Sequence, residues 1–375
     1  MPFGLYIHLP FCKKKCPYCN FSSITGAEGL IKGYIEALNI ELDHRLNEQY
    51  KGIPKTIYIG GGTPSIVPSA YIKKIVERFI PDTSIEFTVE ANPESANKSW
   101  LNGILESGAN RLSIGIQSLD NRVLHHLGRL HKAKDAILSV IQAKRAGFTN
   151  ISVDLMFGVP GQTIEIWERT LKEVLKLEPE HISCYSLGID EDTEYYEMSI
   201  NRELEIPDPD KTVDMYILMM EMLKKNGIMQ YELSNFARRG WECKHNQAHW
   251  NFTPYLGIGA SAHSFDGNIR SWNESSPERY IQKISAKNDA TTGYEILDEN
   301  KRMFEIIMLS LRTRDGLNLE NLESLSHEKI RFLEKKINTF VESGFMESCN
   351  NRSIKLTSRG AVIANEIISD ILIDV

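Results

Sequence analysis

The sequence predicts an α/β protein whose first half forms a mostly parallel sheet, curled into a closed or partly open barrel. Short runs rich in β-branched and apolar residues alternate with amphipathic helical segments. The expected strands are residues 5–9, 56–59, 85–89, 112–116, 152–155 and 181–186, and the clearest helices are 31–46, 69–79, 133–146 and 165–177. This alternation favours a parallel sheet. Periodicity alone also fits a doubly wound open sheet.

Chemically suggestive residues come just after these predicted strands. Cys12 follows the first strand and residues 60–63 follow the second. Glu90, Gln117 and Asp154 mark the ends of the next three. In a β/α barrel the carboxyl ends of the strands share one face, where sites are assembled from several loops. We therefore expect these residues to converge on a single site.

The second half of the chain has a different rhythm. A helix is expected at 212–225, and a Tyr-, Trp- and Gly-rich stretch with few regular repeats follows at 231–272. The last part reads as helix from about residue 297, helix 328–343, strand 353–357 and helix 361–372. We expect a barrel core at 1–206, an extension carrying a binding segment at 207–295, and a mostly helical, winged-helix-like accessory domain at 296–375, acting as a structural part or a lid.

Composition excludes several classes of protein. The 375 residues carry a formal net charge of -7 and are 42% hydrophobic, which is typical of a globular chain rather than a disordered one. The acidic balance argues against nucleic acid as a partner. No apolar run approaches the roughly 20 residues of a membrane span, and the N-terminus lacks signal-peptide features. We expect a cytoplasmic protein.

The strongest motif is C-x3-C-x2-C, formed by Cys12, Cys16 and Cys19. Structural zinc and ferredoxin-type clusters normally take four protein ligands. Three thiolates on one tight loop would leave one iron of a four-iron cluster open to the amino and carboxylate groups of S-adenosylmethionine. The alternative is a zinc site completed by a distant residue such as His8 or Cys243.

Several motifs together identify a family. YIHLPFCKKKCPYCNF and GGGTPS, with EANPES, GIQSLD, LGRLH, DLMFGVPGQT and HNQAHW, resemble the radical S-adenosylmethionine enzymes of the oxygen-independent coproporphyrinogen-oxidase type. The resemblance covers nearly the whole chain. It implies a partial (β/α)6 TIM-like barrel with a C-terminal accessory domain, a [4Fe-4S] cluster on the three cysteines, and bound S-adenosylmethionine.

The resemblance also implies which residues hold S-adenosylmethionine. Tyr6 would lie beside the sulfonium. Gly61, Gly62 and Thr63 would approach the methionine end, where glycine lets the backbone come close. Glu90 would meet the amino or ribose end.

Three further residues complete the implied pocket. Gln117 and Arg129 would bond the ribose and the carboxylate, for which a guanidinium is well suited. Asp154 would take the ribose hydroxyls. Taken singly, Arg129 could equally form a surface ion pair and Asp154 could cap a helix or loop.

Three features place the chain nearest to the HemW-type heme chaperones within this family. The oxidases usually continue the cysteine run as C-x-C, whereas Phe21 stands here, and their N-terminal extension has no counterpart before residue 5. The chaperone branch carries H-N-x-x-Y-W, which residues 245–250 nearly reproduce as HNQAHW. The resemblance implies His245 as a heme ligand, with His249 as a second candidate. Cys243 could also reach a heme, and His245 could instead be a structural hydrogen-bonding group.

The sequence therefore predicts a heme-binding radical S-adenosylmethionine protein that passes heme to apoproteins such as respiratory heme proteins. The alternative is an enzyme, the oxygen-independent oxidase that converts coproporphyrinogen III to protoporphyrinogen IX. A third reading is another radical reaction on an unidentified substrate. We expect heme and heme-requiring apoproteins as partners, membrane association that is at most transient, and no nucleic acid; a homodimer stays open.

Overall fold

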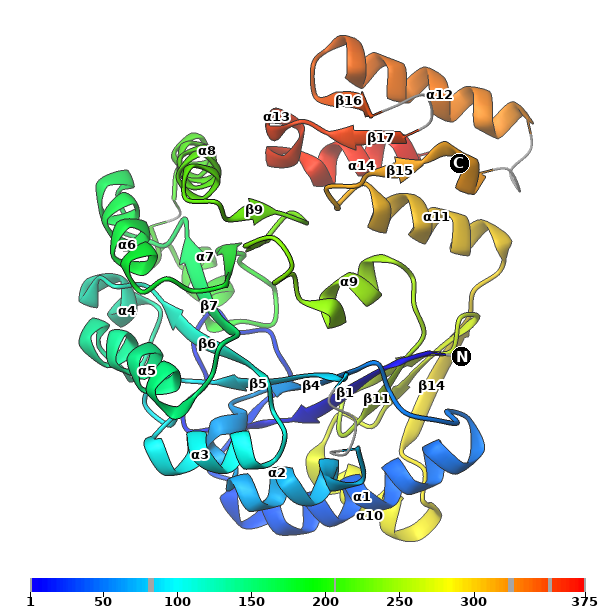
Figure 1. The fold of residues 1–375 in the computed structure, drawn as a ribbon. Helices are drawn as coiled ribbons and strands as arrows, with labels where there is room; N and C mark the ends of the chain where they lie inside the picture. Colours follow the sequence, from blue (N-terminus) through cyan, green and yellow to red (C-terminus); the bar gives the residue numbers. More distant parts are fainter. Residues whose placement is uncertain (1, 80–83, 206, 323–326, 350–352, 374–375) are drawn as a thin grey trace.

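The chain forms one large curved sheet with helices on its outer face and a smaller C-terminal unit beside it (Figure 1). The computed structural model describes residues 2–79, 84–205, 207–322, 327–349 and 353–373. Its central strands, paired in this order and all parallel, are β1 (Gly4–Leu9), β4 (Thr56–Gly61), β5 (Glu86–Ala91), β6 (Arg111–Gln117), β7 (Ile151–Phe157) and β8 (His181–Ser186). Each contains or overlaps a predicted strand. Among the described strands β1 and β8 lie apart in the sheet order, so the predicted partial barrel is confirmed in its open form.

Helices follow these strands, and most of them cover the outside of the curve (Figure 1). They are α1 (Ile31–Glu48), α2 (Ser69–Val76), α3 (Lys98–Glu106), α4 (Asn121–His126), α5 (Ala133–Ala146), α6 (Ile164–Lys176), α7 (Glu194–Ile200) and α8 (Pro209–Lys225), with short 3-10 turns at Glu28–Leu30, Pro64–Ile66 and Glu77–Phe79. Side chains fix their starts: Asn97 accepts a hydrogen bond from the backbone of Trp100, and Thr163 accepts one from Ile166. The long predicted helices are confirmed.

Residues of the central strands alternate between two environments. Leu5, Ile7 and Leu9 of β1 are fully buried against the outer helices. The intervening positions face the lumen of the partial barrel, and on the six strands they are mostly polar. A TIM barrel packs its interior with branched apolar side chains. A polar lumen indicates instead a space built to hold a ligand.

The stretch expected to have few regular repeats in fact extends the sheet at both edges. β11 (Tyr255–Ile258) pairs in parallel with β1, and β12 (His263–Phe265), β13 (Ile269–Asn273) and β14 (Thr291–Ile296) continue it antiparallel, with α10 (Pro277–Lys287) packed outside. At the other edge lie β10 (Asn235–Ala237) and β9 (Met229–Gln230). Most of these strands are too short for a readable alternation, which is why the sequence pattern missed them.

A short helix, α9 (Lys244–Trp250), lies on the concave side of the sheet (Figure 1). Glu86, at the start of β5, accepts hydrogen bonds from the backbone N–H groups of Lys244 and His245, each at 3.0 Å. Thr56, at the start of β4, bonds the ring of His245 at 2.8 Å. The polar lumen therefore anchors α9 through both backbone and side chain.

The C-terminal unit has a hydrophobic core of its own. It contains α11 (Glu299–Ser310), β15 (Leu317–Asn318), a 3-10 turn (Leu319–Leu322), α12 (His327–Glu342), β16 (Met346–Cys349), β17 (Ser353–Leu356), α13 (Ser358–Val362) and α14 (Ala364–Leu372). β17 pairs with β15 and β16 in a small antiparallel sheet. This mostly helical arrangement is the one that the sequence predicts.

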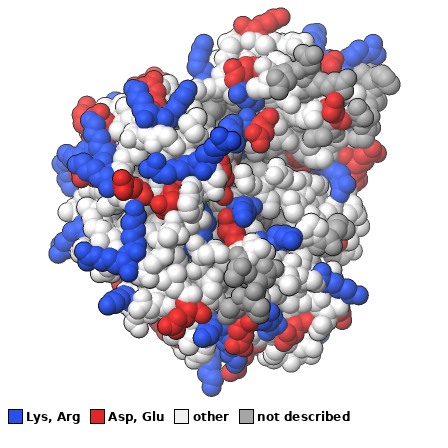
Figure 2. All heavy atoms as spheres, viewed as in Figure 1, with Lys and Arg blue, Asp and Glu red and all other residues white. Residues whose placement is uncertain are grey.

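Charged groups of both signs are interspersed on the face seen in Figure 2, over the barrel and over the C-terminal unit. None of the helices in the described ranges combines the length and the apolar character that crossing a bilayer requires.

One buried carboxylate ties α1 to the sheet extension. Glu41 is 1% exposed and accepts hydrogen bonds from the Gly259 backbone at 2.9 Å, the Asn273 side-chain amide at 2.6 Å and the Tyr280 hydroxyl at 2.7 Å. Its three partners come from the turn after β11, the end of β13 and α10. This cluster holds the outer helix layer against the edge beside β1.

Replacing Glu41 by Ala is expected to destabilise the fold by about 3 kcal/mol or more, because three buried donors lose their acceptor at once. Urea denaturation of parent and variant measures the difference. Glu36→Ala, on an exposed position of the same helix, is the matched control and should stay within about 0.5 kcal/mol. A loss in Glu41→Ala no larger than in this control would contradict the proposed role of the cluster.

Candidate functional site

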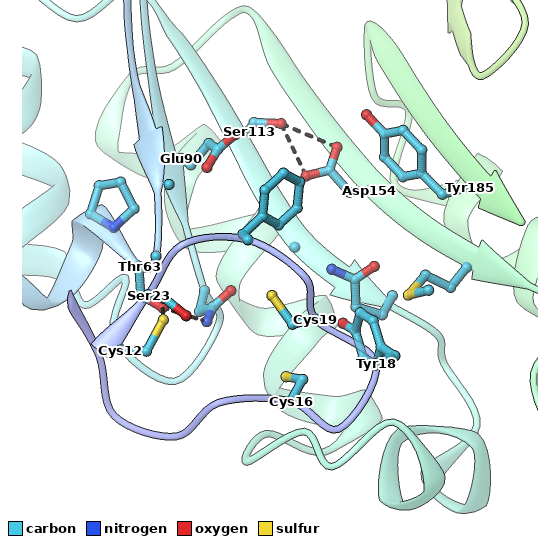
Figure 3. A pocket seen from close by; sticks show the side chains of 18 of the residues that line it. Cys12, Cys16, Tyr18, Cys19, Ser23, Thr63, Glu90, Ser113, Asp154 and Tyr185 are labelled. Atoms are coloured by element: carbon cyan, nitrogen blue, oxygen red, sulfur yellow. Dashed lines mark hydrogen bonds between the residues drawn. The ribbon is translucent and has the colours of Figure 1, made fainter. Parts of the chain in front are cut away.

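A cavity of about 340 Å³ lies where the central strands end, under the loop that carries the three cysteines (Figure 3). Parallel strands deliver their carboxyl ends to one edge, so the loops that follow them share this space. Most of the predicted site residues line it: Cys12, Cys16, Cys19, Gly61, Gly62, Thr63, Glu90, Gln117, Arg129 and Asp154. The convergence expected from the sequence is therefore present.

The cysteine loop is held by a two-strand pair, β2 (Phe11–Cys12) with β3 (Ile24–Thr25), and by a turn from Cys16 to Cys19. All three thiols are free. Burial raises the pKa of Cys12 and of Cys19. Within the described ranges no three Cys, His, Asp or Glu side chains converge closely enough to hold a single metal ion.

The glycines of the GGGTP turn are required because β1 and the start of the cysteine loop lie close to it. Gly61 has a φ of 113°, and a Cβ there would lie 2.6 Å from the ring of His8. A Cβ on Gly62 would lie 2.6 Å from the backbone oxygen of Phe11. Thr63 then donates a hydrogen bond to the sulfur of Cys12 at 3.5 Å. The turn therefore brings backbone and hydroxyl directly against the loop.

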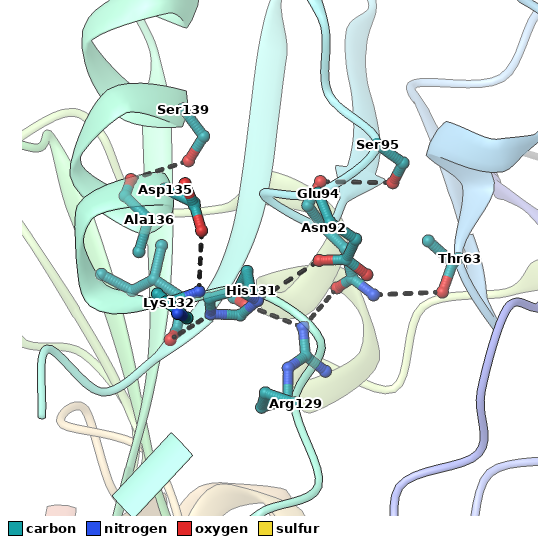
Figure 4. Close-up of polar contacts among 12 residues, drawn as sticks. Thr63, Asn92, Glu94, Ser95, Arg129, His131, Lys132, Asp135, Ala136 and Ser139 are labelled. Atoms are coloured by element: carbon teal, nitrogen blue, oxygen red, sulfur yellow. Dashed lines mark hydrogen bonds and ion pairs between the residues drawn. The ribbon is translucent and has the colours of Figure 1, made fainter. Parts of the chain in front are cut away.

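Arg129 is fixed by a polar network behind the cavity (Figure 4). Its guanidinium donates to Asn92 Oδ1 at 2.7 Å, to the Gly115 backbone at 2.9 Å and to the sulfur of Cys16 at 3.6 Å. Asn92 in turn donates to Thr63 at 3.2 Å. Arg129 is thus no surface ion-pair residue, because its charge is aimed at the cavity and the cysteine loop.

Two carboxyl groups face the same space from β5 and β7 (Figure 3). Glu90 accepts a hydrogen bond from the Tyr58 hydroxyl at 2.7 Å, and burial raises its pKa to about 7. Asp154 accepts a hydrogen bond from Ser113, 3.2 Å from each carboxyl oxygen, and burial raises its pKa as well. Asp154 is therefore a lumen residue of the sheet and not a helix cap. Both groups can exchange protons or receive hydroxyl and ammonium donors from a ligand.

Gln117 ends β6 with a left-handed backbone, φ 59°, and the pairing of β6 with β7 shifts register just before it. A non-glycine residue in this region is strained by about 1 kcal/mol, and such strain is concentrated at functional sites. The irregularity turns the Gln117 side chain into the cavity wall.

Tyr6 lines a second, smaller cavity of about 240 Å³ rather than the large one. Its hydroxyl lies 3.0 Å from the His8 ring. The two cavities adjoin, since Tyr58, Glu90 and Asn246 are among the residues that line both. Tyr6 sits in the middle of β1, one layer below the strand ends, and it shares the smaller cavity with Gly61 and Glu90 of the predicted site.

The two histidines of α9 differ in their surroundings. His245 is 3% exposed, and its ring nitrogens are engaged by Thr56 at 2.8 Å and by His249 at 3.3 Å. Burial lowers the pKa of His245 well below its ordinary range and that of His249 to about 4, so both rings are neutral. His249 is only half-buried and packs on Tyr255 with ring centres 4.4 Å apart. Cys243 lies buried with its sulfur 3.5 Å from Glu86.

Sequence reasoning missed several lumen residues. Asn92, which positions Arg129, stands in the EANPES motif directly after β5. Arg111, Ser113, Ser183 and Tyr185 also line the large cavity from within strands. The signal that could have found them is the period-two placement of polar residues in strands that are otherwise apolar.

Comparison with known proteins defines the family. The radical SAM superfamily model matches residues 6–174, and the HemN C-terminal domain model matches residues 297–363. The heme chaperone HemW of Bacillus subtilis is 33% identical over 368 residues, covering 96% of this chain and 97% of the relative. The chain belongs to the HemW family. HemW of Lactococcus lactis is likewise 33% identical, over 100% of this chain and 98% of its own length.

The HemW-family assignment agrees with the fold. Coproporphyrinogen III oxidase (HemN) from Escherichia coli, described as a radical SAM enzyme, superposes with a TM-score of 0.84 over 99% of this chain and 90% of the oxidase. The two sequences are 23% identical, so this likeness establishes the shared architecture. The predicted family and fold are both confirmed.

The raised pKa of Glu90 predicts a pH-dependent stability. The unfolded chain loses this proton near the ordinary pKa of 4.5 and the folded chain near 7, so the carboxyl weakens the fold as pH rises through this window. Above about pH 7 the loss of stability caused by this carboxyl no longer changes with pH. Each pKa unit corresponds to about 1.4 kcal/mol. The free energy of unfolding of Glu90→Gln, relative to that of the parent, should therefore rise by up to roughly 3 kcal/mol from about pH 5 to about pH 8.

Urea denaturation of parent and Glu90→Gln at both pH values measures this gain. Glu106→Gln, an exposed position on α3, is the control. A parent–variant difference that stays constant from acid to neutral pH would show that burial does not perturb Glu90.

Proposed function

We propose that this chain is a heme chaperone that holds a [4Fe-4S] cluster, S-adenosylmethionine and heme, and delivers heme to apoproteins such as respiratory heme proteins. One observation carries the proposal. Asn246 of α9 lines the cysteine cavity and also both adjoining cavities that His249 lines. A heme held on α9 would therefore lie next to the cofactor cavity.

The cysteine loop fits a cluster better than a single ion. Three free thiols on one loop border the same cavity, and three thiolates are the ligand set that would hold three irons of a cube and leave the fourth iron open. Arg129 and Thr63 donate hydrogen bonds to two of the sulfurs, and such donors stabilise sulfur that carries negative charge. A cluster with one open iron supplies an electron to a bound sulfonium compound.

The cavity beside the loop offers groups that suit S-adenosylmethionine. The backbone of Gly61 and Gly62 is accessible for close approach, and Arg129 provides a fixed positive charge for a carboxylate. Glu90 and Asp154 provide acceptors for the ammonium group and the ribose hydroxyls. In this proposal Gln117 bonds the ribose, and Tyr6 supports the site from the adjoining cavity rather than touching the sulfonium.

For heme, His249 is the better ligand candidate of the two histidines. His245 uses both ring nitrogens inside the fold, and its closeness to Thr56 ties it to the strand β4. His249 is neutral, partly exposed and borders two cavities, so a heme iron would reach its ring once the contact between its Nε2 and that of His245 is broken. The sequence motif implied His245 as the heme ligand and His249 as the second candidate; this proposal prefers His249. His245 then acts by holding α9 in the lumen.

Cys12→Ser, Cys16→Ser and Cys19→Ser are each expected to prevent stable cluster assembly. After anaerobic reconstitution, iron should fall from about four atoms per chain to below about one, with loss of the visible absorbance of the cluster. Cys349→Ser in the C-terminal unit removes a thiol remote from the loop and should retain the cluster. Equal iron contents in the loop variants and the Cys349 variant would contradict the assignment.

His249→Ala is expected to weaken hemin binding at least tenfold and to move the Soret maximum, because the iron loses its imidazole ligand. His263→Ala, at the exposed first position of β12, is the matched control. His245→Ala should lower the stability of the protein and leave the Soret maximum unchanged. A shifted maximum in His245→Ala together with an unchanged one in His249→Ala would assign the iron to His245 instead.

The oxidase alternative is separated by a direct assay. Reconstituted protein with reductant, S-adenosylmethionine and coproporphyrinogen III is expected to form no protoporphyrinogen IX, while transferring bound heme to an apoprotein acceptor. Catalytic formation of protoporphyrinogen IX would overturn the chaperone proposal.

A further inference from the structure

A third cavity, of about 500 Å³, lies between α9 and the C-terminal unit. One wall is α9 itself, with Asn246, His249 and Trp250. The opposite wall includes Arg312 and Asn365 of the C-terminal unit. The volume falls in the range of sites for drug-sized ligands and cofactors, roughly 300–1,000 Å³. The C-terminal unit therefore completes a binding space that α9 begins.

The chain fixes Arg312 at this wall through its backbone. The Arg312 carbonyl accepts a hydrogen bond from the Leu233 backbone at 3.1 Å, and Arg314 donates to the Tyr231 backbone at 3.0 Å. Glu232 and Thr313 form a β-bridge between these two bonds. The segment after α11 thus pairs with the chain that follows β9, and the guanidinium is presented to the cavity from a rigid junction.

Most N–H donors of the Arg312 guanidinium are not used within the described part of the protein. It donates to Asn365 Oδ1 at 2.7 Å, and within the described ranges it makes no ion pair with a carboxylate. The nearby acid, Glu232, is occupied by the Ser234 backbone at 3.2 Å and by the Asn235 side chain. Glu232 attracts the Arg312 guanidinium electrostatically, but no carboxylate in the described ranges forms a direct ion pair with it. The remaining planar donors of the guanidinium therefore suit the carboxylate of a ligand.

A ligand that suits both walls has an apolar face, a metal ion that an imidazole can coordinate, and a carboxylate at its edge. His249 offers the imidazole, Trp250 an aromatic surface, and Arg312 the carboxylate partner. Heme has this combination, with propionate groups on one edge of the ring. The chemistry of the two walls is thus complementary to the two ends of one molecule.

We infer that Arg312, supported by Asn365, binds a heme propionate, so that the C-terminal unit is part of the heme site. The inference rests on the proposed function and adds to it a specificity for the carboxylate edge of the porphyrin. Ligand discrimination then lies in the C-terminal unit, whereas the iron ligand lies on α9.

The test titrates full-length protein with hemin and, separately, with hemin dimethyl ester, whose propionates carry no charge. The parent should bind the ester about tenfold more weakly than hemin. Arg312→Gln should bind hemin about tenfold more weakly than the parent, with an unchanged Soret maximum, and should bind the ester as the parent does. Arg312→Lys, which keeps the charge, should recover part of the affinity for hemin.

Arg314→Gln is the matched control, because this exposed arginine belongs to the same segment but does not line the cavity. It should bind hemin as the parent does. Equal affinities of the parent for hemin and its ester, or an equal loss of both ligands in Arg312→Gln, would overturn the role of Arg312 while leaving heme binding intact. A parent that binds no hemin would overturn the proposed function itself, and this inference with it.

Discussion

The open lumen of the sheet imposes the main constraint on this molecule. Six strands turn polar side chains inward, and buried polar groups are costly unless each finds a partner. Helix α9 provides partners for two of these groups: its first backbone N–H groups donate to Glu86, and the ring of His245 bonds Thr56. The lumen in turn holds a helix of only seven residues, which would be unstable alone. Sheet and helix thus depend on each other, and their contact fixes where Asn246 and His249 can point.

The same constraint separates two kinds of residue in the binding region. Groups at or after the strand ends, such as Gln117 and Arg129, reach the cavity because the segments that follow parallel strands share one edge of the sheet. Groups deeper in the strands lie at the bottom of the two cavities: Tyr6 lines the smaller cavity and Arg111 lines the large one. The charge of Arg111 lies within electrostatic range of Glu86, so even the floor of the lumen carries balancing charges.

Sequence reasoning succeeded where the pattern is local. The strand ends near Gly61, Glu90 and Gln117 follow from apolar runs punctuated by polar residues, and the shared face of a parallel sheet brings them together. It could not foresee that Tyr6 lines the adjoining cavity, which shares Gly61 and Glu90 with the large one, since depth in the lumen depends on the stagger of neighbouring strands. It also could not foresee that Thr56, from a distant strand, engages the ring of His245. The strands between residues 255 and 273 are held by pairing with β1 and with one another, and their own short sequences carry little signal.

The pairing of β1 has a consequence for how the protein is made. Gly4 lies between Thr56 on one side and Tyr255 on the other, and the cysteine loop follows directly from this strand. During synthesis the first partner emerges early, whereas the second leaves the ribosome only after most of the polypeptide. Contacts between such distant parts of a chain form slowly. The strand that carries the cysteine loop is therefore flanked on both sides only late in synthesis, and until then the loop lacks the support of the complete sheet.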